Sequence, residues 1–286
     1  MFYGSLFVTL RLTNVFTIVS YNKNEGKVHK PAIERNRDIQ PRGTAALLSV
    51  SADDVMFVNV EAVPELASTS YLSASMQRFW EAMPRPDGVS PDEAYAAMGH
   101  CAEFGRVACV TVGVIRTRKP DDTPYFITSS YVSDDERSPL CDFAEVLDNF
   151  FSQQARGHFV CGHNILRSEI PFFARRLVIN RLRLPALFDY HGRRKLADNV
   201  IDTADFWAMS DFASSRVDAP LLASVLGVDA DPDDYDPARA AELFHQDNDL
   251  DAIARRSERK VFTSAQIFRS IRNESLILSD HFIRKD

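Results

Sequence analysis

The sequence predicts a mixed α/β fold in which an antiparallel meander and parallel strands form one sheet flanked by helices. Three observations predict it. Segments 55–60 and 105–115 are apolar and rich in β-branched residues, as buried strands are. Segment 124–132 follows after a loop rich in Pro and Asp, which indicates a hairpin. Apolar residues then recur at helical spacing from Leu140 to Phe151, which places a helix across one face of the sheet.

The second half of the chain alternates strands with helices. Segment 158–161 is expected to be a fourth strand, and a helix follows it with Pro171 in its first turn. Further helices are expected over 220–226, ended by Gly227, and over 250–272. The helix that contains Pro171 has an apolar stripe, formed by Ile170, Phe173, Ala174, Leu177 and Val178.

Length and composition favour one large domain with an N-terminal extension. The chain has 286 residues, of which 45% are hydrophobic, so it can bury a single large core. We expect residues 46–286 to form this domain. Residues 6–21 alternate as extended structure does, and residues 22–45 are expected to be a basic, partly disordered linker.

Charge and cysteine content narrow the function classes. A net charge of -7 argues against a protein that binds nucleic acid through overall positive charge. The four cysteines show no C-x-x-C spacing, so neither a zinc site nor a disulfide framework is expected. We expect reduced thiols, a cytoplasmic location and no membrane association.

Five segments, in order, resemble one family. They are MFVNVEAVPEL, EFGRVACVTVGVI, VCGHNILRSEIPFFARRLVIN, IDTADFW and DLDAIARRSERKVFTSAQIF, and they span roughly residues 54–271. Together they resemble the 3′-5′ exonucleases related to the proofreading domain of family-B DNA polymerases. The resemblance implies an RNase H-like fold. It also implies a two-metal phosphodiesterase, in which carboxylates hold two Mg²⁺ or Mn²⁺ ions and a Tyr or His orients the attacking water.

This sequence departs from the family pattern at most of the site positions. Asn59 stands where the family has its first Asp, and Glu61 keeps the Glu two residues later. Glu169 replaces an Asp after the string GHN. Arg256 occupies the place of the Tyr, and Lys260 that of the last Asp. If any metal is held, Glu61 and Glu169 are its expected ligands.

The expected electrostatics disfavour a metal pair. An ammonium about 4 Å from a divalent cation costs roughly 8 kcal/mol at an effective dielectric constant of about 20. Millimolar affinity is worth only about 4 kcal/mol. We therefore expect no cofactor, with Mg²⁺ or Mn²⁺ only if the protein is active. Lys260 is expected to turn away or to pair with Glu61 or Glu169.

Other interpretations of these residues stay open at this stage. A shift of two residues in the alignment with the family would place Glu258 at the position of Lys260. A second alternative is that Arg256 and Lys260 form a solvated helix face, as most charged runs on helices do. Asp229, Asp231 and Asp233 imitate a calcium loop but lack its Gly and its bidentate Glu. His163 and Asn164 are expected to hydrogen-bond the turn after the fourth strand.

Basic side chains offer a surface that would contact phosphates, or else an ordinary charged exterior. The candidates are Arg175, Arg176, Arg193, Arg194 and Lys195. The preferred function is a catalytically degenerate exonuclease relative that binds single-stranded DNA or RNA 3′ ends. The alternatives are an active Mg²⁺-dependent 3′-5′ exonuclease that borrows Asp202 or Asp205, and a scaffold for an unknown protein partner.

Overall fold

A computed structural model describes residues 7–12, 15–22, 27–29, 47, 49–85, 88–152, 157–188, 199–209, 211 and 217–285. The chain divides into two compact units, Met1–Pro41 and Arg42–Asp286. The first contains a three-stranded antiparallel sheet of β1 (Phe7–Leu12), β2 (Val15–Asn22) and β3 (Lys27–His29). The extended structure expected over residues 6–21 is confirmed for the described residues of β1 and β2. β3 was not predicted and lies in the segment expected to be a linker, most of which falls outside the described residues.

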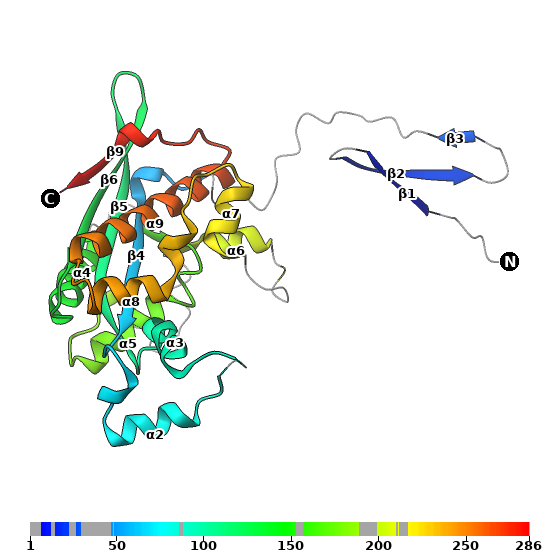
Figure 1. Cartoon of the computed structure of the whole chain (residues 1–286). Helices are drawn as coiled ribbons and strands as arrows, with labels where there is room; N and C mark the ends of the chain where they lie inside the picture. Colours follow the sequence, from blue (N-terminus) through cyan, green and yellow to red (C-terminus); the bar gives the residue numbers. More distant parts are fainter. Residues whose placement is uncertain are drawn as a thin grey trace. The chain divides into compact units, whose positions relative to one another are not determined.

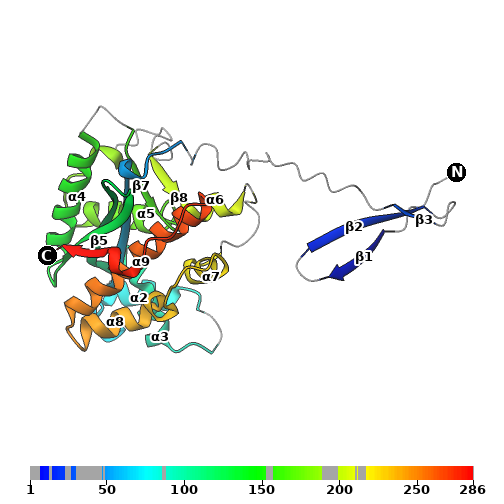
Figure 2. The same cartoon turned by 90° about the horizontal axis from the view of Figure 1, so that it is seen from above.

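The second unit is built around a six-stranded sheet in the order β8-β7-β4-β5-β6-β9. Figure 1 labels β4, β5, β6 and β9, and Figure 2 labels β7 and β8. β5 is antiparallel to both of its neighbours, β4 and β6. The pairs β4–β7, β7–β8 and β6–β9 are parallel, so β5 alone of these six strands runs in the opposite direction. The mixed α/β fold and the four expected strands are confirmed. Their bounds are β4 (Val55–Pro64), β5 (Gly105–Arg118), β6 (Thr123–Val132), β7 (Phe159–Gly162), β8 (Val200–Asp202) and β9 (Phe282–Lys285).

Helices cover both faces of this sheet. The α-helices of the second unit are α2 (Ala74–Ala82), α3 (Pro91–Ala96), α4 (Arg137–Ser152), α5 (Glu169–Ile179), α6 (Thr203–Ala208), α7 (Ala219–Val225), α8 (Pro237–His245) and α9 (Leu250–Ile271). Figure 2 shows α9, in orange and red, as the long helix of this unit. Short 3-10 helices lie at Ala52–Asp54, Thr69–Tyr71, Ala97–His100, Ala186–Phe188, Pro232–Tyr235 and Ser279–His281.

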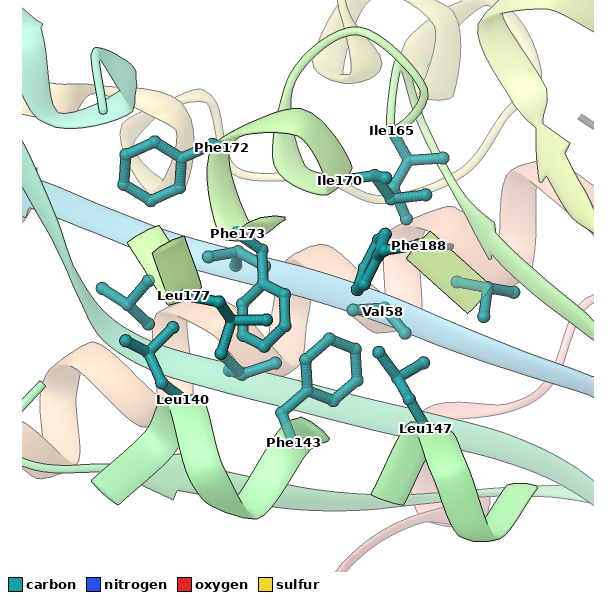
Figure 3. Packing of buried hydrophobic residues seen from close by; sticks show 14 of the residues in the cluster. Val58, Leu140, Phe143, Leu147, Ile165, Ile170, Phe172, Phe173, Leu177 and Phe188 are labelled. Carbon is teal, nitrogen blue, oxygen red and sulfur yellow. The ribbon is translucent and has the colours of Figure 1, made fainter. Parts of the chain in front are cut away.

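The alternation of side chains along β4 assigns each residue to a face. Val58 and Val60 pack against α4 and α5, in the core cluster of Figure 3 that includes Phe143 and Phe173. Phe57 packs on the opposite face with Phe268 of α9. Because successive strand residues point to opposite faces, Asn59 and Glu61 share the α9 face with Phe57.

One predicted stripe is partly wrong. In α5, Ile170, Phe173 and Leu177 are buried as expected, but Val178 is 60% exposed. Phe172 and Arg176 are buried instead. The buried arc of α5 is therefore shifted around the helix, because His100 packs against Phe172, and Glu136, which directly precedes α4, pairs with Arg176.

Within the described residues, no helix is both long enough and apolar enough to cross a membrane. All four cysteines belong to these residues, and each is a free thiol in the structure.

Candidate functional site

The topology of the sheet opens a site between β4 and β7. From β4 the chain continues to β5 and β6 on one side, and it then returns to β7 and β8 on the other. Such a reversal between two adjacent parallel strands leaves a crevice at their carboxyl ends, where α/β proteins bind ligands. β7 ends at Gly162, whose Cβ, if present, would lie 3.2 Å from the carbonyl oxygen of Val58. Asn59 and Glu61 therefore extend past the end of β7.

Glu61 lies at the centre of a buried charge cluster. Lys260 Nζ donates to Glu61 Oε2 at 2.8 Å and to Oε1 at 3.1 Å. Arg256 Nε donates to Glu61 Oε1 at 2.9 Å. The exposed fractions of Glu61, Arg256 and Lys260 are 1%, 2% and 9%. Arg256 and Lys260 are four residues apart on α9, so both reach the same carboxylate, and neither belongs to a solvated helix face.

Asn59 completes this cluster. Its Nδ2 donates to Ser257 Oγ at 2.9 Å and more weakly to Glu61 Oε2 at 3.4 Å. An Asp at this position would place a second carboxylate beside Glu61. The amide instead donates a proton toward Glu61, so it adds no negative charge to the cluster.

Arg256 and Lys260 decide the protonation state of Glu61. Burial by itself would raise the pKa of Glu61, because it disfavours the charged form. The charges of Lys260 and Arg256 and their hydrogen bonds outweigh burial, so the pKa of Glu61 lies below its usual value. Glu61 is therefore ionised at neutral pH and its charge is neutralised by protein groups.

Glu258 does not take the place of Lys260. It is 3% exposed, accepts a hydrogen bond from Ser130 Oγ at 2.8 Å, and pairs with Arg284 Nε at 3.0 Å. Its partners lie on β6 and β9, whereas Lys260 reaches β4. Glu258 therefore supplies no carboxylate beside Glu61.

Glu169 is the other candidate acid, and it differs from Glu61 in its environment. It is the first residue of α5, and its Oε2 is buried without a hydrogen-bond partner in the described part of the chain. Burial raises the pKa of Glu169 to about 7, against a smaller lowering by the charge of Lys260. Near neutral pH this carboxyl exists in both protonation states.

Asp202 has a structural role. Its carboxylate accepts backbone N–H groups of Asn164 at 2.8 Å, Leu166 at 3.2 Å and Ala204 at 3.0 Å. These bonds hold the loop after β7 against the start of α6. Burial raises the pKa of Asp202 although these bonds oppose it. Asp202 thus uses both oxygens to fix the crevice.

His163 and Asn164 fix the loop after β7 in different ways. His163 Nδ1 lies 3.0 Å from Thr203 Oγ1, and Nε2 lies 2.8 Å from the carbonyl oxygen of Val217. His163 therefore links the loop to α6 and to the segment before α7, rather than to its own turn. Asn164 has a φ of 58°, and its backbone N–H binds Asp202.

A cavity of about 370 Å³ lies beside the charge cluster. Its polar lining comes from β4, the loop after β7, the start of α5, α9 and three segments that the sequence did not single out. The polar lining residues are Asn59, His100, His163, Asn164, Ser168, Glu169, Asp218, Tyr235, Lys260 and Ser264. Part of His100 is exposed, yet desolvation, followed by the charge of Lys260, lowers the pKa of its imidazole.

His100, Asp218, Tyr235 and Ser264 were missed by sequence reasoning. His100 and Tyr235 are in 3-10 helices, and Asp218 precedes α7. These positions belong to no periodic pattern and no family segment, so no local signal identified them. Ser264 lies on α9 one turn after Lys260, and that spacing on the helix predicts a shared face.

The predicted basic surface needs one correction. Arg176 is 5% exposed and donates to Glu136 Oε1 at 2.7 Å and Oε2 at 2.6 Å, and to Glu65 Oε2 at 2.8 Å. It binds α5 to the residues that precede α4 and follow β4, and it is not available to a phosphate. Arg175 is exposed. The remaining candidates, Arg193, Arg194 and Lys195, lie outside the described residues.

Within the described residues, no group of three or more His, Cys, Asp or Glu side chains is arranged to hold a metal ion. No protein-family model matches the sequence, and comparison with curated proteins finds no significant match.

Proposed function

We propose that this chain is a nucleic-acid-binding protein with an RNase H-like fold, related to the polymerase-B-like 3′-5′ exonucleases, whose crevice has lost the catalytic metal pair. The observation that carries the proposal is the pairing of Glu61 with Lys260 and Arg256. The cluster lies where the family resemblance locates the metals. A cytoplasmic location is part of the proposal and agrees with the free cysteines.

The strand arrangement supports the RNase H-like assignment. β4, β5 and β6 form an antiparallel meander, and β7 and β8 add in parallel on the far side of β4. This is the arrangement expected from the resemblance. The three segments that carry its site positions, on β4, α5 and α9, meet at one crevice.

The residues present do not fit a metal pair. A metal bound to Glu61 would meet the Lys260 ammonium, which is 2.8 Å from Oε2 and 3.1 Å from Oε1. At about 4 Å this repulsion is roughly 8 kcal/mol at an effective dielectric constant of about 20. Asn59 supplies an amide where a second charge is needed, and Asp202 is occupied by three backbone N–H groups. We therefore derive no metal-dependent step.

What remains in the crevice suits binding rather than hydrolysis. The cavity next to the cluster has hydroxyl, amide and imidazole groups and the cation Lys260 in its wall. Such groups hydrogen-bond the sugars and phosphates of a strand without reading its sequence. Exposed Arg175 provides a cation for backbone contacts on α5, the helix whose first residue lines the cavity.

Two measurements test the proposal together. Anisotropy of 5′-labelled single-stranded DNA and RNA, in EDTA and in Mn²⁺, should show binding without turnover. Calorimetric titration of Mn²⁺ should give no heat with the natural protein and clear heat with the double variant Asn59→Asp and Lys260→Asp. Cleavage that Mn²⁺ stimulates and that Glu61→Ala abolishes would instead establish an active nuclease.

A matched pair of variants locates the binding. Ser168→Phe fills the cavity, and the Ser168 side chain makes no capping bond that the change would remove. Ser275→Phe adds the same group at an exposed position away from it. Only Ser168→Phe should weaken binding. A protein that binds no strand at physiological salt would contradict the proposal and favour the scaffold interpretation.

A further inference from the structure

The charge cluster carries one more positive than negative charge. Glu61 is the acidic partner of both Arg256 and Lys260. The other acceptors of Arg256 are the backbone carbonyl groups of Asp233, at 2.7 Å, and Asp236, at 2.5 Å, which carry no net charge. A buried excess charge is unfavourable unless a counter-charge compensates it. The cluster therefore favours the approach of an anion.

Lys260 presents this excess charge to the cavity. Its ammonium group has three N–H donors, and within the described residues only Glu61 accepts from it, through its two oxygens. Its Nζ lies 5.4 Å from the ring centroid of Tyr235, which also lines the cavity. Since Lys260 is 9% exposed and lines the cavity, its remaining N–H donor is accessible from the cavity.

The start of α5 adds the positive end of a helix dipole, which has the same preference. Ser168 is the N-cap residue of this 11-residue helix, and its hydroxyl makes no capping bond. The backbone N–H groups of Ser168 and Ile170 donate to the carbonyl oxygens of Asn164 and Ile165, and Pro171 has no N–H, so α5 contributes its dipole rather than free N–H donors. Ser168 of α5 and Ser264 of α9 both line the cavity beside Lys260.

Two acids in the lining oppose an anion. Asp218 is exposed, so water screens its charge. Glu169 has a pKa raised to about 7 by burial, so it carries only part of a charge at neutral pH. Neither carboxylate forms an ion pair with Lys260 among the described side chains.

We propose that this cavity is an anion site that binds the terminal phosphate monoester of a 3′-phosphorylated single strand, with Lys260 as its principal ligand. The inference deepens the proposed function and rests on it for the nucleic-acid part of the ligand. A monoester carries a charge of about -1.5 to -2 at pH 7. An internal diester carries one charge, so the excess cation favours the end of a strand over its interior.

The test uses the full-length protein in EDTA, so that no divalent cation takes part. Inorganic phosphate is titrated by calorimetry, and two single-stranded DNAs of one sequence, with a 3′-phosphate or a 3′-hydroxyl, are compared by anisotropy. We expect heat with phosphate, and about tenfold tighter binding of the 3′-phosphorylated strand, from one charge-assisted hydrogen bond.

Three variants locate the effect. Lys260→Met removes the excess charge while Arg256 still pairs with Glu61, and it should abolish the preference for the phosphorylated strand. Arg255→Met removes the same charge from an exposed position on the same helix and should leave the preference intact. Asn59→Asp keeps Lys260 and cancels the excess positive charge with a second carboxylate, so it should also remove the preference for the phosphorylated strand. It replaces Lys260→Met in the test if that variant does not fold.

The outcomes separate the two proposals. Equal binding of both strands, with no heat from phosphate, would overturn the anion site and leave the proposed function standing. Heat from phosphate without binding of either strand would overturn the assignment to a strand end and the proposed function with it. A similar loss of the preference in Lys260→Met and Arg255→Met would show a diffuse charge effect and overturn the role of Lys260.

Discussion

Lys260 Nζ lies within hydrogen-bond distance of both carboxylate oxygens of Glu61, at 2.8 and 3.1 Å, although the two residues are 199 positions apart. This contact joins the centre of β4 to α9. A protein ammonium thus occupies the place next to Glu61 where the family resemblance implies a metal ion. The electrostatic balance of the crevice follows from this pair.

The first prediction concerns the cost of breaking this cluster. Glu61→Ala leaves Arg256 and Lys260 buried without an acidic partner, so the free energy of unfolding should fall by about 3–5 kcal/mol. Asp251→Ala is the matched control, because Asp251 also pairs with two cations, Arg255 and Arg284, but is 54% exposed. It should cost less than about 1 kcal/mol. Urea unfolding measures both, and equal losses would contradict the special role of the buried cluster.

The second prediction concerns Glu169 and pH. Its pKa is raised to about 7, above the value of about 4.3 expected in the unfolded chain. Between about pH 4.3 and pH 7, Glu169 holds its proton in the folded state more often than in the unfolded state. The stability that this group contributes at low pH is therefore lost as pH rises through about 7. Glu169→Gln removes this dependence. It should stabilise the fold by about 3–4 kcal/mol at pH 8, because each unit of pKa difference between the folded and unfolded states is worth about 1.4 kcal/mol, and change little at pH 4.

Thermal melts at the two pH values measure the effect of Glu169→Gln. Glu93→Gln serves as a control, since Glu93 is exposed and its pKa is lowered by the hydrogen bonds of its capping box with Ser90. A stabilisation by Glu169→Gln that is the same at pH 4 and pH 8 would show that the raised pKa is not its cause.

The third prediction contrasts two neighbouring arginines. Arg176→Ala leaves Glu136 buried without its guanidinium partner and should lower the free energy of unfolding by about 3–5 kcal/mol. Arg175→Ala, at an exposed position, should change it by less than about 0.5 kcal/mol but should weaken binding to single strands. Chemical denaturation and anisotropy measure the two effects. Loss of stability in both variants would contradict the assignment of their faces.

The fourth prediction concerns the packing of β5 against α9. A Cβ at Gly113 would lie 2.2 Å from Phe126 Cζ and 2.8 Å from a methyl of Val261, so Gly113→Ala should cost about 1–3 kcal/mol through overpacking. At Gly157 the nearest atom to a new Cβ, in Phe159, is 3.7 Å away. Gly157→Ala should be neutral or slightly stabilising. Comparison of the two melting temperatures decides the question, and no loss in Gly113→Ala would contradict the close contact.

Local patterns predicted four of the six strands and four of the eight α-helices described in the large unit. β-branched runs predicted β4 and β5, because a strand buried on both faces needs continuous apolar sequence, and the loop before residue 124 predicted β6 as a hairpin partner. Apolar residues at helical spacing predicted α4 and α9, because one face of each helix packs against the sheet. β9 was missed because Phe282–Lys285 is short and becomes a strand only by pairing with β6 at the sheet edge.

The sequence by itself determined which residue types occupy the site: an amide at Asn59, acids at Glu61 and Glu169, and cations at Arg256 and Lys260. The periodicity of a strand also determined that Asn59 and Glu61 share one face, and the periodicity of a helix determined that Arg256 and Lys260 share one face. Only the tertiary structure decided that both cations turn to Glu61 and that Glu258 turns to Ser130. It likewise decided that Arg176 is buried beside Glu136. The charge of a side chain follows from its residue type, whereas its ion-pair partner depends on contacts between segments that are distant in the sequence.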